Sequence, residues 1–276
     1  MTIDRSSLLK MARGEDERVL FSRLLDKIDM AQNRGTPCCT GFLSPGERAA
    51  ADKLLAAAGH PRSLFYGGYG EAERRVCLFL PDWQEEDDAI AWAPLGLLRC
   101  SYSDKSVITH RDMLGSLMAL GIKRDKTGDI IVNPCFSDVI ILSDIGEYLL
   151  TSLTSAGRAK VSTKLLPLSE LSSPRSDSRR VRATVSSLRL DSLISAAFNL
   201  ARGKAAELAV SGRVQLNCSE CLKPDRSLTE GDTVACRGLG KFRLTAVGGL
   251  SKKGRLCVEI EAVSYTHLTL PTTSRV

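Results

Sequence analysis

Arginine and lysine side chains gather in one part of the chain, and these residues bind the phosphate oxygens of nucleic acids. Between Arg175 and Arg255 there are sixteen Lys and Arg against seven Asp and Glu, a net charge of +9. The whole chain carries +6, so the rest of it sums to −3. This asymmetry favours a nucleic-acid partner. The candidate nucleic-acid-binding residues are Arg182, Arg189, Arg202, Lys204, Arg213, Arg237 and Lys241.

Four of these candidates fall beside predicted helix ends, which suits the binding of a phosphate group. Arg189 lies in the first turn of one helix, and Arg202 and Lys204 flank the start of the next. Backbone N–H groups without partners at these helix starts add positive charge. Arg213 follows the end of the second helix, beside the same expected surface. We therefore expect these four side chains to contact the phosphate groups of the nucleic acid directly.

An ordinary solvated surface is the alternative interpretation of the same basic residues. The arginines would then form surface ion pairs with Asp191 and Glu207, and such pairs contribute little free energy. In that case the module would serve protein interaction, and its charge would have no ligand. The sequence leaves both interpretations open.

Motifs for catalysis or metal binding are incomplete in this sequence. His110-Arg-Asp resembles the catalytic loop of protein kinases, but Leu117 stands where a kinase has Asn, and no D-F-G follows. Cys218 and Cys221 have the spacing of a metal or redox pair, yet no second pair completes a zinc site. We interpret the cysteine pair as part of a plain loop. No catalytic residue, metal ligand or cofactor is predicted.

The segment from 183 to 261 is predicted to fold as a small α/β module. Apolar residues recur at helical spacing between Leu190 and Phe198, with Ser187 as a candidate N-cap. A second helix is expected from about Gly203 to Val210, and Gly212 ends it. Strands are expected at 214–216, from 234 onward, and twice between 242 and 260.

Four short blocks in this segment resemble the RNA-binding domain named after ribosomal protein S-four. They are R-L-D at 189–191, A-R-G-K-A at 201–205, S-G-R-V-Q-L-N at 211–217 and E-G-D-T-V at 230–234. Their order and spacing make the resemblance specific, and it implies an α/β fold that binds RNA. The sequence departs from the family at 218–221, where a tight turn is usual, so the hairpin loop is altered.

The fold class predicted for the whole chain is α+β. Residues 1–72 are expected to form an N-terminal helical region, with a helix at 15–33 and a second one capped by Ser44. Residues 73–170 follow the order β-β-α-β-β-α-β, with an acidic loop at 84–88. That order predicts a split βαβ domain of the ferredoxin or RNA-recognition type. Residues 171–182 are rich in Ser and Arg and predict a flexible linker.

A longer motif extends the resemblance to the middle of the chain. The stretch H-R-D-M-L-G-S-L-M-A-L-G-I-K-R-D-K-T-G-D-I-I-V at 110–132, taken with R-G-L-G-K-F-R-L at 237–244, resembles the YlmH-type RNA-binding proteins of bacteria. The resemblance covers residues 1–261 and implies the same three regions. It also implies association with the ribosome, because family members are linked to rescue of obstructed large subunits carrying peptidyl-tRNA, and to cell division. The implied partners are rRNA or tRNA and the large ribosomal subunit.

Residues 262–276 do not continue the charge pattern that precedes them. They resemble translated sequencing-adaptor DNA, so we expect them to be a non-native tail after the module at 183–261. No apolar run approaches the roughly 18 residues of a membrane span, and the N-terminus lacks a signal-peptide pattern. We therefore expect a cytoplasmic protein with neither a membrane partner nor a small-molecule substrate.

A non-catalytic, ribosome-associated RNA-binding protein is the function that the sequence predicts. The alternative is an RNA-modifying enzyme, a pseudouridine synthase or methyltransferase, since S-four-type domains accompany both. In those enzymes a large catalytic domain follows, whereas too few residues follow here. A methyltransferase also needs a glycine-rich cofactor loop, and a tyrosyl-tRNA synthetase needs H-I-G-H and K-M-S-K-S motifs; none of these is evident.

RNA binding through phosphate contacts should depend steeply on salt. The logarithm of the affinity should fall linearly with the logarithm of the salt concentration, with a slope of about −0.7 to −0.9 per contact. Titration of labelled RNA at several KCl concentrations measures this slope. Binding that does not change between low and physiological salt would indicate a protein partner instead.

Overall fold

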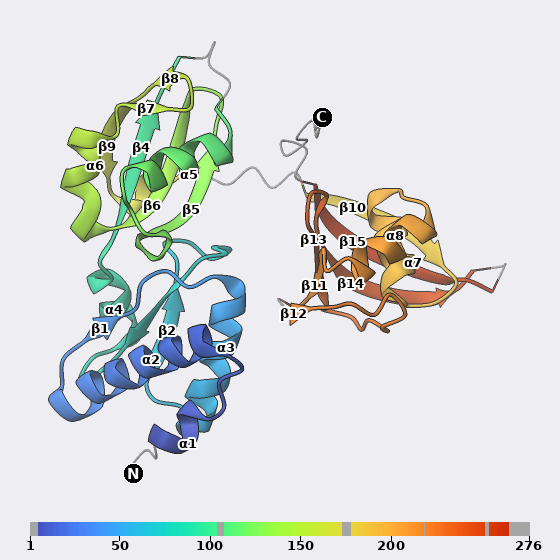
Figure 1. Cartoon of the computed structure of the whole chain (residues 1–276), viewed down its shortest axis with the longest axis horizontal. Helices are drawn as coiled ribbons and strands as arrows, with labels where there is room; N and C mark the ends of the chain where they lie inside the picture. Colours follow the sequence, from blue (N-terminus) through green and yellow to red (C-terminus); the bar gives the residue numbers. More distant parts are fainter. Residues whose placement is uncertain (1–4, 104–107, 173–177, 218, 252–253, 265–276) are drawn as a thin grey trace. The chain divides into compact units, whose positions relative to one another are not determined.

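The computed structural model describes residues 5–103, 108–172, 178–217, 219–251 and 254–264. The chain divides into two compact units, Met1–Pro174 and Arg175–Val276 (Figure 1). Among the described residues, the first unit contains sheets of three, four and two strands, and the second contains one six-stranded sheet. Helices and strands mix in both units, which confirms the predicted α+β class.

The N-terminal part of the first unit packs helices on a small antiparallel sheet. Its helices are α1 (Arg5–Leu9), α2 (Glu15–Arg34) and α3 (Pro45–Ala57), and its sheet has the order β1 (Cys38–Cys39), β3 (Val76–Phe79), β2 (Ser63–Tyr66). The start of α3 is as predicted, because Ser44 and Glu47 cap one another reciprocally. Leu24 and Ile28 of α2 and Leu54 of α3 form its core with buried residues of β3.

The predicted helical region at 1–72 is therefore only partly correct. It also contains β1 and β2, which pair with β3 on either side. The predicted boundary between residues 72 and 73 places β3 in the following domain instead. Every residue of β3 is buried, because its alternate side chains pack into two different hydrophobic clusters. A short apolar run does not show which sheet it joins.

The middle part of the first unit is a four-stranded antiparallel sheet with helices on one face. Its elements follow the order β4 (Leu95–Ser101), α5 (His110–Ala119), β5 (Thr127–Val132), β6 (Phe136–Leu142), α6 (Gly146–Ser152) and β9 (Ser162–Leu166). The strands lie in the order β5-β6-β4-β9, which is the split βαβ arrangement predicted from the sequence. A two-residue hairpin of β7 (Ser155–Ala156) and β8 (Ala159–Lys160) precedes β9.

The last three residues of the predicted acidic loop at 84–88 begin a helix in the structure. Helix α4 (Glu86–Trp92) carries Glu86, Asp87 and Asp88 in its first turn, where negative charge favours the helix dipole. Ala89 of this helix is buried against the sheets. A helix of seven residues with a single buried residue shows almost no periodic pattern of apolar residues, so the sequence does not reveal it.

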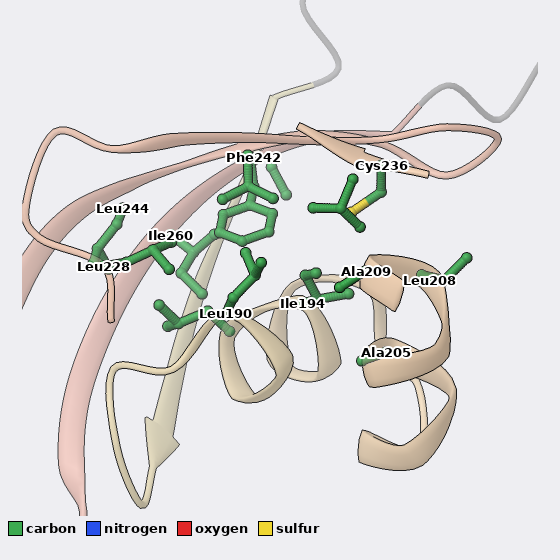
Figure 2. Packing of buried hydrophobic residues seen from close by; sticks show 14 of the residues in the cluster. Leu190, Ile194, Ala205, Leu208, Ala209, Leu228, Cys236, Phe242, Leu244 and Ile260 are labelled. Atoms are coloured by element: carbon green, nitrogen blue, oxygen red, sulfur yellow. The ribbon is translucent and has the colours of Figure 1, made fainter. Parts of the chain in front are cut away.

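The C-terminal unit packs two helices on one face of its sheet. It consists of β10 (Ser178–Val185), α7 (Leu190–Phe198), α8 (Arg202–Val210), β11 (Val214–Leu216), β12 (Ser219–Glu220), β13 (Thr233–Cys236), β14 (Gly240–Leu250) and β15 (Leu256–Ser264). The strand order is β10-β15-β14-β13-β11-β12, and every neighbouring pair is antiparallel. Leu190 and Ile194 of α7 lie in the core with Phe242 and Ile260 of the sheet (Figure 2).

Three predictions about this unit are wrong in their boundaries. The expected linker at 171–182 includes the start of β10, which pairs with β15 from Ser178 onward. The expected tail at 262–276 includes the end of β15, in which Ala262 is buried in the core. Ser187 does not cap α7, because Arg189 is the N-cap residue. Residues 265–276 and Cys218 lie outside the described residues.

Replacement of a core leucine tests the packing of α7. Leu193 is completely buried, so Leu193→Ala should lower the free energy of unfolding by about 2–5 kcal/mol. Leu222→Ala is the matched control, because the exposed Leu222 should cost no more than about 0.5 kcal/mol. Urea unfolding followed by circular dichroism measures both values. Equal losses in the two variants would contradict the described core.

Candidate nucleic-acid interface

A buried carboxylate binds two of the predicted arginines in the C-terminal unit. The Nε and Nη2 atoms of Arg189 each lie 3.2 Å from an oxygen of Asp191. The same atoms of Arg202 contact that carboxylate at 3.1 and 3.4 Å. The Asp191 side chain is 6% exposed, whereas those of Arg189 and Arg202 are 39% and 51% exposed. We call Asp191 and these two arginines the Asp191 cluster.

The fold of α7 and α8 brings the three residues together. Asp191 lies in the first turn of α7, Arg189 immediately precedes that helix, and Arg202 begins α8. Between the helices Asn199 takes a left-handed conformation with φ of 53°, and Leu200 donates its N–H to the carbonyl oxygen of Ser195. This tight connection reverses the chain, so Arg202 contacts a carboxylate that lies eleven positions earlier in the sequence.

Asp191 stays ionised because its partners outweigh its burial. Burial alone raises the pKa of a carboxyl group, but hydrogen bonds from Arg189 and Arg202 lower the pKa of Asp191 below its ordinary value. Ser192 also donates its backbone N–H to this carboxylate, at 2.8 Å. The cluster therefore holds two positive charges and one negative charge at neutral pH.

The backbone amides at the start of α7 differ from the sequence prediction. The N–H groups of Leu190 and Asp191 donate to the carbonyl oxygens of Arg226 and Pro224, each at 2.9 Å. These amides are therefore occupied by the chain itself. Lys204 is exposed in the first turn of α8. The positive charge of this region therefore comes from the side chains of Lys204 and the Asp191 cluster.

Arg213 and Arg237 form a second group. Arg213 lies after α8, and its Nη2 donates to the carbonyl oxygen of Arg237 at 3.1 Å. The N–H of Arg237 in turn donates to the carbonyl oxygen of Arg213 at 2.8 Å. Helix α8 has nine residues and is about 13 Å long, so Arg202 and Arg213 stand at its opposite ends. The structure therefore separates these predicted contacts into two groups.

Arg182 and Lys241 lie on the sheet face that the helices leave uncovered. Side chains alternate between the two faces of a strand. Val185 of β10 and Phe242 of β14 lie in the core under α7, so Arg182 and Lys241 point to the opposite face. Arg182 pairs with Glu259 at 2.7 Å. The register also places Arg180 and Arg243 on this face, on either side of Glu261. Strand alternation could have revealed these two arginines, which the sequence prediction omitted.

The middle sheet carries its own buried ion pair on the face away from its helices. Asp138 is completely buried and binds Arg99 through two hydrogen bonds of 2.7 and 2.8 Å. Arg99 also donates to the carbonyl oxygen of Glu170 and lies 4.5 Å above the ring of Phe136. Leu168 and Leu171 pack against the hydrophobic cluster that contains Ile140 and Leu142 of this sheet. The segment after β9 thus covers part of this face.

The described residues contain neither a membrane-spanning helix nor a cluster of metal ligands. No helix in that part of the chain is both long and apolar enough to cross a membrane. Within the same residues, His, Cys, Asp and Glu side chains form no group of three or more that could hold a metal ion. Cys221 donates its thiol to the carbonyl oxygen of Lys223 at 3.7 Å. The interpretation of Cys218 as part of a plain loop stays a prediction.

Comparison with known proteins identifies the family. The chain is a multidomain α+β protein, and residues 94–170 match the family model described as "Putative RNA-binding domain in YlmH". It is 33% identical over 250 residues to "Ribosome-associated protein quality control protein P2" of Bacillus subtilis (strain 168), covering 90% of this chain and 95% of that protein. The solved structure "Cell division protein ylmH from Streptococcus pneumoniae" is 21% identical, with a TM-score of 0.48, over 58% of this chain and 96% of that one. The chain belongs to the YlmH family of bacterial RNA-binding proteins.

The basic residues outside the Asp191 cluster allow a test without disturbing its carboxylate. The double variant Lys204→Ala/Arg213→Ala should weaken RNA binding by about 1–3 kcal/mol, as for the loss of charge-assisted hydrogen bonds. Both side chains are exposed, so the free energy of unfolding should change by less than about 0.5 kcal/mol. Arg182→Ala is the control on the other face, where Glu259 already balances the charge. Fluorescence anisotropy with labelled RNA measures the affinities of the unaltered protein, the double variant and the control. A larger loss of affinity for the control would place the site on the uncovered sheet face.

Proposed function

We propose that this protein is a non-catalytic RNA-binding protein that acts on the ribosome. Its ligand would be rRNA or tRNA on the large subunit, and its location the cytoplasm. The observation that carries the proposal is the 33% identity along 95% of a Bacillus subtilis relative whose name states ribosome association and quality control. Similarity along nearly the whole relative favours a shared role more strongly than a match to a single domain would.

The charge and the geometry of the C-terminal unit support the same function. Its residues from Arg175 to Arg255 carry a net charge of +9. The Asp191 cluster and Lys204 place three cations at the starts of α7 and α8, and Arg213 and Arg237 add two more beyond α8. Positive side chains on fixed elements bind the phosphate backbone regardless of sequence, which suits a folded RNA surface. We propose these residues, rather than the uncovered sheet face, as the main RNA contacts.

The middle domain would then contribute to positioning more than to base stacking. RNA-recognition domains stack bases on aromatic residues of their open sheet face. In this chain Phe136 lies against Arg99, and residues 168–172 pack over or bond to that face. The RNA-modifying enzyme is the weaker alternative, because the described residues after α8 form strands of the same sheet rather than a catalytic site.

Sedimentation with ribosomal subunits tests this function. Purified protein mixed with bacterial ribosomal subunits should travel with the large subunit in a sucrose gradient at low salt and leave it as the salt rises. Crosslinking in cells, followed by sequencing of the bound RNA, would identify the rRNA or tRNA segment. Recovery of the protein only at the top of the gradient, under all salt conditions, would contradict the proposal.

A further inference from the structure

We infer that Asp191 is a positioning residue for RNA binding, which holds Arg189 and Arg202 as a fixed pair directed at the phosphate backbone. The inference rests on the proposed function and deepens it, because it assigns a role in RNA binding to an acidic residue. The charge of that residue alone would weaken RNA binding. A carboxylate repels phosphate. Its presence among the proposed contacts therefore needs a physical reason.

The hydrogen-bond geometry leaves the outer edge of each guanidinium available. An arginine side chain has five N–H donors, and each arginine of the cluster directs Nε–H and one Nη2–H at Asp191. Three donors remain on each side chain, and no further acceptor contacts them among the described residues. Both side chains are partly exposed while the carboxylate between them is buried. Phosphate can therefore approach the two cations without meeting the anion.

A fixed pair binds more tightly than two mobile cations of equal charge. Free arginine side chains lose rotamer entropy when a ligand immobilises them. The buried carboxylate has already fixed both guanidiniums before RNA arrives, because each is held by two hydrogen bonds. Arg99 and Asp138 in the middle domain make the same kind of contact, but there Arg99 also binds Glu170 and faces Phe136. Only the Asp191 cluster combines two arginines with one carboxylate in the part of the chain that the structure describes.

Asp191→Asn separates positioning from charge. The variant gains one unit of net positive charge, so long-range attraction alone predicts tighter RNA binding. The amide group of Asn carries N–H donors of its own and accepts fewer hydrogen bonds, so it releases at least one arginine. We expect the affinity for a fluorescein-labelled RNA stem-loop, measured by anisotropy, to fall about tenfold. We also expect a flatter dependence on KCl, because phosphate contacts are lost.

A charge-preserving variant provides the second test. Arg189→Lys/Arg202→Lys keeps both cations but removes the paired contacts that a guanidinium makes with one carboxylate. It should also lose about tenfold in affinity. The matched control is Arg180→Lys/Arg243→Lys on the uncovered sheet face, which should bind as the unaltered protein does. Thermal melting of each variant reports its folded fraction. Partial unfolding would lower the apparent affinity for RNA, but it would not change how steeply that affinity depends on the KCl concentration.

The outcomes separate this inference from the proposed function. If the unaltered protein binds neither the stem-loop nor large subunits, the proposed function fails, and the inference with it. If it binds and the Asp191→Asn variant binds as tightly or more tightly, the function stands and the inference is overturned. Should Asp191→Asn fail to fold, the lysine variant decides: affinity equal to that of the unaltered protein overturns the inference, and a tenfold loss with a flatter salt slope supports it.

Discussion

The C-terminal unit depends on the pairing of one buried negative charge. Removing a carboxylate from water is costly unless cations and hydrogen bonds replace the lost solvation. Asp191 obtains them from Arg189, Arg202 and the N–H of Ser192. Because these partners come from α7, from the residue before it and from α8, the ion pairs fix one helix against the other. The N–H groups of Leu190 and Asp191 extend the same region to the backbone at 224–226.

The same interaction has a different consequence in the middle domain. Arg99 and Asp138 form one bidentate pair on the sheet, and the backbone of Glu170 and Ser172 closes over it. The pKa of Asp138 is lowered although burial raises it, because Arg99 and Ser172 donate hydrogen bonds to it. This pair ties the segment after β9 to its sheet. The Asp191 cluster keeps donors at the surface, which suits binding rather than closure.

Local sequence signals predicted most of the elements, and they failed where a signal was too short. The capped helix at Ser44, the succession of β4, α5, β5, β6, α6 and β9, and the end of α8 before Gly212 all lie where expected. The strands β1 and β2 and the helix α4 were missed, because two to seven residues show little periodicity. The boundaries near 178 and 262 were wrong because strand pairing, rather than composition, sets them.

The sequence by itself determined the fold class, the family and the concentration of positive charge, since these depend on residue order and count. It also proposed both outcomes for the arginines, phosphate contacts or pairing with Asp191. Only the tertiary structure showed that Arg189, before α7, and Arg202, at the start of α8, share one buried carboxylate while both side chains stay partly exposed. Strand alternation likewise turned Arg182 and Lys241 to the other face. Such groupings join residues distant in sequence, so no local pattern encodes them.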